Sequence, residues 1–171
     1  MYHFKAQNTA VILMGSNLGD KVGYMQFAIE AMTKAGIKVL EKSSYYESEA
    51  WGFESDTFIN QAITCSTVLT PHQLLAVLQN IEKDAGRNSK TQNEYAARTL
   101  DLDIIFFNHQ IIDNNDLTIP HPQVQNRNFA LIPLKEIIPN FKHIILQKTI
   151  ATLTNECPDK GKVSRLVQVE E

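Results

Sequence analysis

Residues 98–107, which read as a strand, are the part of the chain that most limits its possible folds. In a strand, side chains alternate between two faces, so Asp101 and Asp103 share a face with Cα atoms roughly 6.5 Å apart. The residues expected on the other face are Leu100, Leu102, Ile104 and Phe106. Beyond Asp103 both faces are apolar, which is typical of a central strand covered on each side.

The two aspartates lie at the mouth of this strand, where paired carboxylates are costly unless a positive group sits on them. Arg98 is one candidate for that group. A divalent cation is the other, because Mg²⁺ prefers carboxylate oxygens and keeps coordination sites open for phosphate. An Asp-x-Asp is also short enough to arise by chance, in which case it is a solvated strand end paired with arginine.

The chain has 171 residues, which predicts one domain with a core extending over residues 10–139 and a tail over 140–171. A hydrophobic content of 43% and a charged content of 20% are typical of a globular protein. The net charge of −3 argues against a general nucleic-acid binder. We expect a monomer.

Two cysteines, Cys65 and Cys157, have no metal-like spacing, and we expect free thiols in a reducing compartment. The sequence has neither an 18-residue apolar run nor the apolar segment of a signal peptide. We therefore expect a cytoplasmic protein with no membrane contact.

The order of elements predicts the fold class. Strands are expected at residues 10–14, 37–46, 58–69 and 98–107, with one helix capped by Asp20 or Asn17 and another capped by Thr70. Thr70 and Gln73 form a capping box, which is a strong helix start. The order β-α-β-β-α-β indicates an α+β, ferredoxin-like antiparallel sheet with two helices on one face.

The later segments are less regular. Residues 87–97 have no apolar periodicity and indicate a loop, and a hairpin is expected through residues 108–113. A short edge strand at 117–119, a helix within 127–138, a weak helix at 150–155 and a possible strand at 163–169 follow.

Three arginines, Arg87, Arg98 and Arg127, accompany the carboxylate pair in a chain of negative net charge. Such a group suggests a nucleoside triphosphate with Mg²⁺, although ordinary surface ion pairs would use the same residues. From the residues alone, Gly15 to Gly19 indicate a strand-to-helix turn, since no Gly-Lys-Ser/Thr follows, and His121 fits a turn histidine.

Five motifs then occur in one order: Gly15-Ser16-Asn17-Leu18-Gly19, Phe58-Ile59-Asn60-Gln61-Ala62, Ile81-Glu82 with Gly86-Arg87, Arg98-Thr99-Leu100-Asp101-Leu102-Asp103-Ile104, and Pro120-His121-Pro122 with Arg127 and Phe129. On these motifs the chain resembles the 6-hydroxymethyl-7,8-dihydropterin pyrophosphokinase family. The motif around Asp101 with the downstream Pro-His is highly specific, whereas the others are individually weak.

The resemblance implies transfer of pyrophosphate from ATP to the pterin's hydroxymethyl oxygen, in folate biosynthesis, with release of AMP. It implies two Mg²⁺ ions on Asp101 and Asp103, which with Arg87 and Arg98 are the implied catalytic residues. Positions that match ATP contacts are Gln79, Glu82, Arg87, Arg98, Ile104, His121 and Arg127. Positions that match pterin contacts are Ser48, Trp51, Phe58, Asn60, Asp101 and Phe129. The alternative for Phe58 and Phe129 is that both rings only pack in the core.

Some positions depart from the family's pattern. Ala96-Ala97 replace a usual Gly-Pro, Tyr95 stands where tryptophan is common, and Phe58 replaces a common tyrosine. Ser89 stands at a usually basic position, and the loop is about one residue longer. We expect altered loop closure with metal binding intact.

Two other function classes remain open from the sequence. A ferredoxin-like sheet also serves as a regulatory or protein-binding module, since this fold hosts many functions. The other class is a different Asp-x-Asp transferase, for nucleotidyl or glycosyl groups. Only the pterin assignment needs Asn60 and Phe129.

Overall fold

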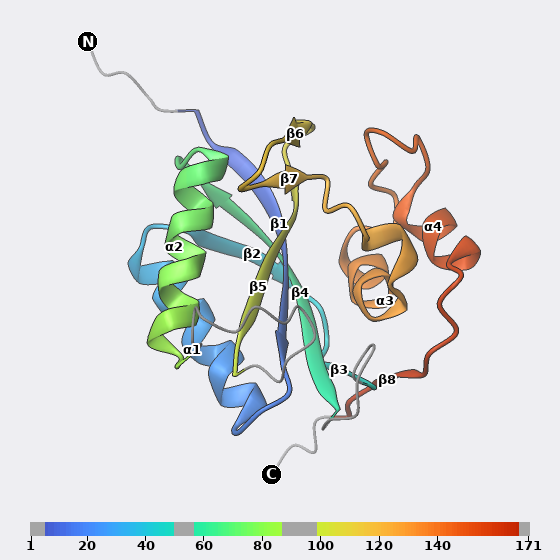
Figure 1. The fold of residues 1–171 in the computed structure, drawn as a ribbon, viewed down its shortest axis with the longest axis horizontal. Coiled ribbons are helices and arrows are strands. Elements are labelled where there is room, and N and C mark those ends of the chain that lie inside the picture. The colour runs from blue at the N-terminus through green and yellow to red at the C-terminus, as the bar shows by residue number, and fades with distance from the viewer. Residues whose placement is uncertain (1–5, 50–56, 87–98, 168–171) are drawn as a thin grey trace.

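The structure is a computed structural model that describes residues 6–49, 57–86 and 99–167 (Figure 1). The expectations for Trp51, Arg87, Arg98 and the loop at 87–97 lie outside these residues. Among the described residues, no helix has the length and hydropathy that a bilayer crossing requires.

An antiparallel sheet forms the centre of the fold, and this confirms the predicted α+β, ferredoxin-like class. Its strands follow the order β5-β1-β4-β3-β8, and β2 pairs with β4 next to β3. Their bounds are β1 Asn8–Ser16, β2 Lys38–Lys42, β3 Tyr46–Ser48, β4 Phe58–Thr67, β5 Asp101–Phe107 and β8 Val163–Arg165.

Helices α1 (Lys21–Lys34) and α2 (Pro71–Asp84) cover one face of the sheet, as predicted. Asp20 caps α1 by accepting from the Gly23 backbone N–H, and Thr70 caps α2 through the expected capping box. Their apolar side chains form a first core with one face of β1 and β5, including Met25, Met32, Leu74, Leu78, Ile12 and Ile104.

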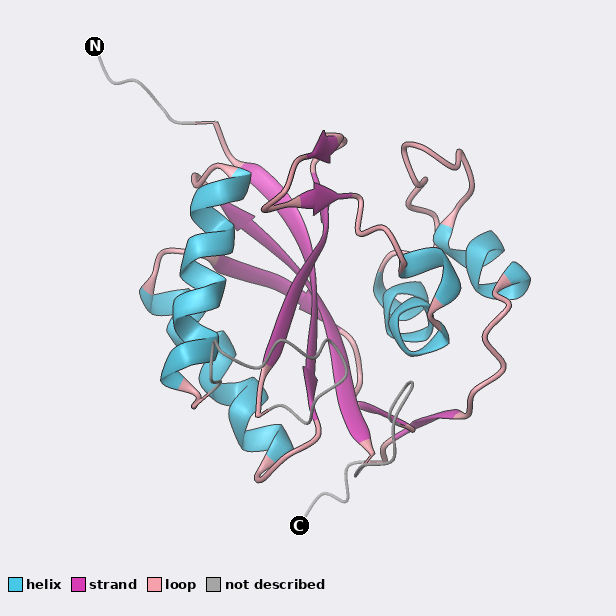
Figure 2. Ribbon diagram, viewed as in Figure 1, coloured by secondary structure: helices cyan, strands magenta, loops and turns pink. Residues whose placement is uncertain are grey.

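The opposite face is also covered, by α3 (Asn128–Ile137) and α4 (Ile150–Glu156), so the molecule has three layers (Figure 2). A second core joins Leu131 and Leu134 of α3 and Leu153 of α4 to Val11 and Leu13 of β1. The expected arrangement with helices on one face therefore describes α1 and α2 only. The residues after 139 supply α4 and the fifth strand in the order, β8.

Strand β5 differs in two ways from the sequence expectation. It lies at the end of the strand order rather than in the centre, although both of its faces are buried. The register with β1 shifts between Val11 and Ile12, so that Ile12 pairs with Ile104 and Val11 with Phe106. A bulge adds one residue to one strand and breaks the alternation. Phe106 consequently lies in the second core and not on the face of Leu102.

Two further expectations need correction. The predicted strand at 37–46 is divided into β2 and β3, between which Ser43 donates its backbone N–H to the Ala62 carbonyl. The hairpin expected through 108–113 does not return along β5. Instead β6 (Ile112–Asp113) pairs with β7 (Thr118–Ile119) in a separate two-stranded sheet.

Candidate active site

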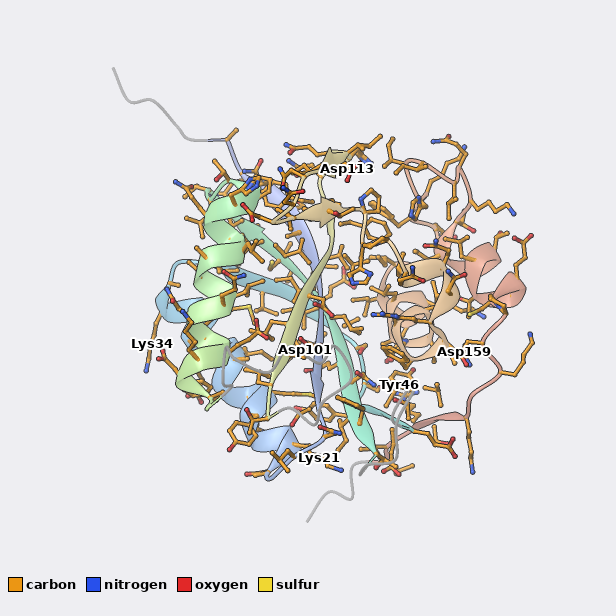
Figure 3. All side chains as sticks on the ribbon, in the orientation of Figure 1. Lys21, Lys34, Tyr46, Asp101, Asp113 and Asp159 are labelled. Carbon is orange, nitrogen blue, oxygen red and sulfur yellow. The ribbon has the colours of Figure 1, made fainter. Side chains whose placement is uncertain are left out.

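One row of residues crosses five strands near one end of the sheet. The strand register pairs Asp101 with Gly15, Gly15 with Asn60, Asn60 with Tyr46, and Tyr46 with Arg165. Directly opposed residues of antiparallel strands point to the same face. The row therefore lies on the face covered by α3, and Figure 3 shows Asp101 on β5 and Tyr46 on β3 with β1 and β4 between them.

Gly15 lets the Asn60 side chain approach the backbone of β1 closely. A Cβ atom at Gly15 would lie 2.9 Å from Oδ1 of Asn60 and 3.8 Å from the Phe58 ring, so the Asn60 amide lies over the glycine. Asn60 is buried and donates from Nδ2 to the Ser48 hydroxyl over 3.0 Å. The sequence indicated only a turn here, because strand register is what places Gly15 against Asn60.

Replacing Gly15 with alanine is expected to weaken pterin binding about tenfold, because the new methyl group must displace a buried amide. The affinity for an ATP analogue should stay within about twofold of wild type, since the clash is on the Asn60 side of the row. Calorimetric titration of each ligand measures both. Equal losses for the two ligands would mean that the substitution disturbs the whole sheet.

Asp101 and Asp103 are half-buried at the start of β5 and point to the α3 face, since their partners are Gly15 and Leu13. Two carboxylates on one face are hard oxygen ligands of the kind that Mg²⁺ accepts. The described residues hold no group of three or more acidic, histidine or cysteine side chains placed for a metal. Two protein carboxylates nevertheless fit an ion that takes its other ligands from phosphate and water.

His121 lies beside this acidic pair. Burial and, to a smaller extent, the charge of Arg127 lower its pKa to about 4, against the opposing effect of Asp101. Its Nδ1 accepts from the backbone N–H of Gln123 over 3.2 Å, so the ring's single proton at neutral pH resides on Nε2. At pH 7 the side chain is therefore a neutral hydrogen-bond donor rather than a cation.

The pKa of His121 makes the protein less stable in acid. Between the ordinary value of 6.5 and about 4, the unfolded state binds a proton that the folded state does not, so stability falls as the pH falls through this window. Urea unfolding at several pH values should give a smaller acid loss for His121→Gln than for wild type. Identical pH profiles would contradict a His121 whose pKa is lowered in the folded state.

Arg127 and Phe129 extend from the start of α3. The Arg127 guanidinium carbon lies 5.8 Å from the centre of the Phe129 ring, and both side chains are half-buried. Phe129 packs against the second core, on the same side of the sheet as Asn60. Phe58 is half-buried and lies two residues before Asn60 on the same face of β4, so both rings lie on the α3 side of the sheet.

Three further expected ATP contacts that the structure describes, Gln79, Glu82 and Ile104, lie on the other side of the sheet. Glu82 is buried and Gln79 is exposed, and both belong to α2. The Ile104 side chain is 4% exposed within the first core, so any contact it makes with a ligand must be through its backbone. Asp101 and Asp103 at the start of β5 lie on the opposite face from Ile104.

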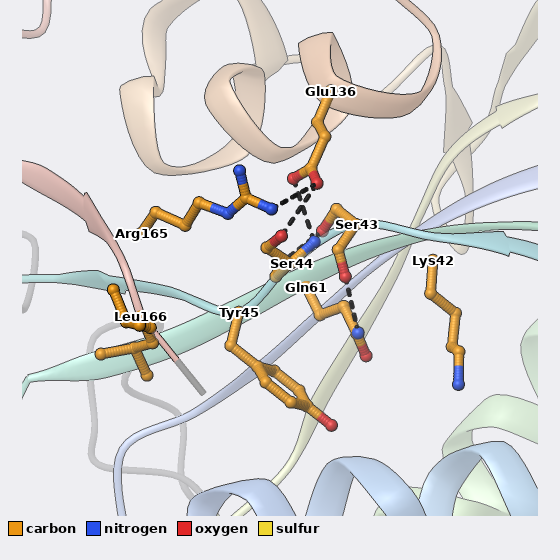
Figure 4. Close-up of a pocket in the computed structure, with 9 residues that line it drawn as sticks. Lys42, Ser43, Ser44, Tyr45, Gln61, Glu136, Arg165 and Leu166 are labelled. Carbon is orange, nitrogen blue, oxygen red and sulfur yellow. Dashed lines mark hydrogen bonds and ion pairs between the residues drawn. The ribbon is translucent and has the colours of Figure 1, made fainter. Parts of the chain in front are cut away.

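A cavity of about 560 Å³ lies at the other end of the row, where β3 meets β8 and α3 (Figure 4). Its lining includes Lys42, Ser44, Tyr45, Gln61, Glu136 and Arg165. Among the described residues, none of the expected substrate contacts lines it, so this cavity is separate from the acidic pair.

Acidic oxygens, a neutral histidine and an arginine on one face suit an enzyme that handles a phosphorylated substrate. Residues 11–139 match the family model for 7,8-dihydro-6-hydroxymethylpterin-pyrophosphokinase (HPPK). The chain is 36% identical over 143 residues to the Aquifex aeolicus 2-amino-4-hydroxy-6-hydroxymethyldihydropteridine pyrophosphokinase, and the match covers 83% of this chain and 88% of that protein. The Bacillus subtilis protein of the same name is 39% identical, over 76% and 78% of the two chains.

Longer proteins contain a similar part. Folic acid synthesis protein FOL1 of Dictyostelium discoideum is 36% identical over 93% of this chain, which spans 24% of its length. A solved Plasmodium falciparum HPPK-DHPS with pteroate matches with a TM-score of 0.71 at 17% identity, over 91% of this chain and 43% of that chain. This chain therefore spans less than half of either protein, and the structural match supports the fold alone.

The chain belongs to the HPPK family. It is an ATP-dependent pyrophosphokinase that transfers pyrophosphate to hydroxymethyldihydropterin in folate biosynthesis.

Proposed function

We propose that the α3 face of the cross-strand row is where the pterin and the triphosphate meet. The observation that carries this proposal is the placement of Asn60 and Asp101 on one face, two strands apart, with the bare Gly15 between them. Strands lie about 4.8 Å apart, so the two Cα atoms are separated by about 10 Å. A flat bicyclic ring spans such a separation.

The pterin site uses one amide and aromatic rings. Asn60, held by Ser48, reads the polar edge of the ring, since an amide offers both a donor and an acceptor. Phe58 and Phe129 supply stacking surfaces. By resemblance Trp51 adds a further contact, and Asp101 lies at the hydroxymethyl end.

The triphosphate site uses the acidic pair and positive or neutral donors around it. Arg127 contributes charge, and neutral His121 contributes its Nε2–H. By resemblance, the other ATP contacts are Gln79, Glu82, Arg87, Arg98 and the backbone of Ile104.

Asp101 and Asp103 would hold Mg²⁺, two ions by resemblance, which when bound supply positive charge against the triphosphate and activate the acceptor hydroxyl. The hydroxymethyl oxygen attacks the β-phosphorus, and AMP leaves. Arg87 and Arg98, with Arg127, stabilise the charge that develops on the transferred group and on AMP. His121 keeps a phosphate oxygen in place without changing its own charge near pH 7.

We also propose that the chain acts as a cytoplasmic monomer. Both described cysteines are buried free thiols, which fits a reducing compartment.

Product analysis tests the proposal. With ATP, Mg²⁺ and 6-hydroxymethyl-7,8-dihydropterin, mass spectrometry should find AMP and the pterin diphosphate in equal amounts. The 6-methyl analogue, which lacks the acceptor oxygen, is the control and should release no AMP. Formation of ADP with a pterin monophosphate would contradict attack at the β-phosphorus.

A further inference from the structure

We propose that Glu136 is a positioning residue for the pterin site, which fixes α3 against the strand pair that holds Asn60. This inference rests on the proposed function. It concerns a carboxylate that the five sequence motifs do not include, close to the second end of the cross-strand row.

The Glu136 carboxylate receives three hydrogen bonds from the β3 region. The Tyr46 hydroxyl donates to Oε2 over 2.7 Å, and the Ser44 backbone N–H donates to Oε2 over 3.0 Å. The Ser44 hydroxyl donates to Oε1 over 2.9 Å. Arg165 Nη2 of β8 lies 3.8 Å from Oε1 (Figure 4). This is a dense set of partners for one side chain near the surface.

These bonds outweigh the effect of burial on the carboxylate. Burial alone would raise the pKa of Glu136, but the hydrogen bonds from Tyr46 and Ser44 lower it. Burial and the Glu136 charge raise the pKa of Tyr46 to about 12, so its hydroxyl remains a donor. The link is therefore fully formed at neutral pH.

The link connects the two halves of the pterin site. Tyr46 pairs with Asn60 across the β3–β4 ladder. Glu136 follows Phe129 by seven residues in α3, which is close to two helical turns, so both residues share one face about 10.5 Å apart along the axis. Holding Glu136 to β3 thus fixes the rotation of α3, and with it the direction of the Phe129 ring on the Asn60 side of the sheet.

The apolar contacts of α3 do not supply the same constraint. Leu131 and Leu134 pack into the second core, but hydrophobic contacts are not directional. Directional hydrogen bonds at the far end of the helix set its rotation. Glu136 lies away from Asp101, so its loss should affect pterin binding and leave the phosphate chemistry intact.

Two variants test the inference. Glu136→Gln removes the charge and leaves one acceptor, and Tyr46→Phe removes a single hydrogen bond and keeps the ring. Each should raise KM for the pterin about fivefold to tenfold with kcat and KM for ATP within about twofold, as expected for a lost hydrogen bond to a charged group. The double variant should be no worse than Glu136→Gln alone, because both changes break one link.

Glu156→Gln is the matched control, since Glu156 at the end of α4 forms an exposed ion pair with Lys148 and its loss should leave every parameter unchanged. An unchanged KM for the pterin in both test variants, or equal rises in KM for both substrates, would overturn the positioning role. If Glu136→Gln fails to fold, the KM of Tyr46→Phe for the pterin decides the question. A wild-type chain without pterin-dependent AMP release would instead overturn the proposed function.

Discussion

Replacing Asp101 with alanine is expected to lower pterin-dependent AMP release by about a thousandfold or more. Asp101 lies at the start of β5, opposite Gly15, and shares the α3 face with Asp103. Removing it leaves Asp103 as the only carboxylate of the pair, which weakens the hold on Mg²⁺ beside the triphosphate. Turnover is measured by the appearance of AMP at saturating ATP and pterin.

Asp113→Ala is the control for this variant, because that aspartate is exposed on β6 and should leave turnover unchanged. Pterin affinity without ATP should stay within a few fold in Asp101→Ala. Turnover that stays above a tenth of the wild-type value would show that Asp101 is not part of the reacting centre.

Replacing Asn60 with alanine is expected to weaken pterin binding by about a hundredfold, since a buried amide that reads a polar ring edge leaves the ligand's groups unpaired when removed. The loss also leaves the buried Ser48 hydroxyl without the donor it accepts from. Equilibrium fluorescence or calorimetric titration with the pterin measures the change.

Thr64→Val is the control for Asn60→Ala, because Thr64 lies four residues along the same strand and face and pairs with Val11. It should bind the pterin as wild type does, and ATP affinity should be unchanged in both variants. Unchanged pterin affinity in Asn60→Ala would show that the substrate lies elsewhere.

Local signals predicted much of the fold. The Thr70 capping box and the Asp20 cap depend on groups within three residues of each other, so the sequence placed the start of α2 and limited the cap of α1 to Asn17 or Asp20. The bulge in β5 was not predictable from its own residues, because it arises from the register with β1. Phe106 was consequently assigned to the wrong face.

The site was predicted in parts. Motif resemblance selected Asn60, Asp101 and His121, which the fold brings to one side of the sheet near one end. The close approach of Asn60 to Gly15 could not be predicted from the sequence, because it depends on which residue of β4 lies opposite Gly15. The same holds for Glu136, whose partners lie about ninety residues earlier in the chain.

A structure of the chain with a non-hydrolysable ATP analogue, Mg²⁺ and 6-hydroxymethyl-7,8-dihydropterin tests the central claim most directly. We expect the pterin ring between Phe58 and Phe129 with its polar edge on Asn60, and metal density at Asp101 and Asp103. A pterin bound instead in the cavity beside Ser44 and Arg165, or metal away from the two aspartates, would contradict the account.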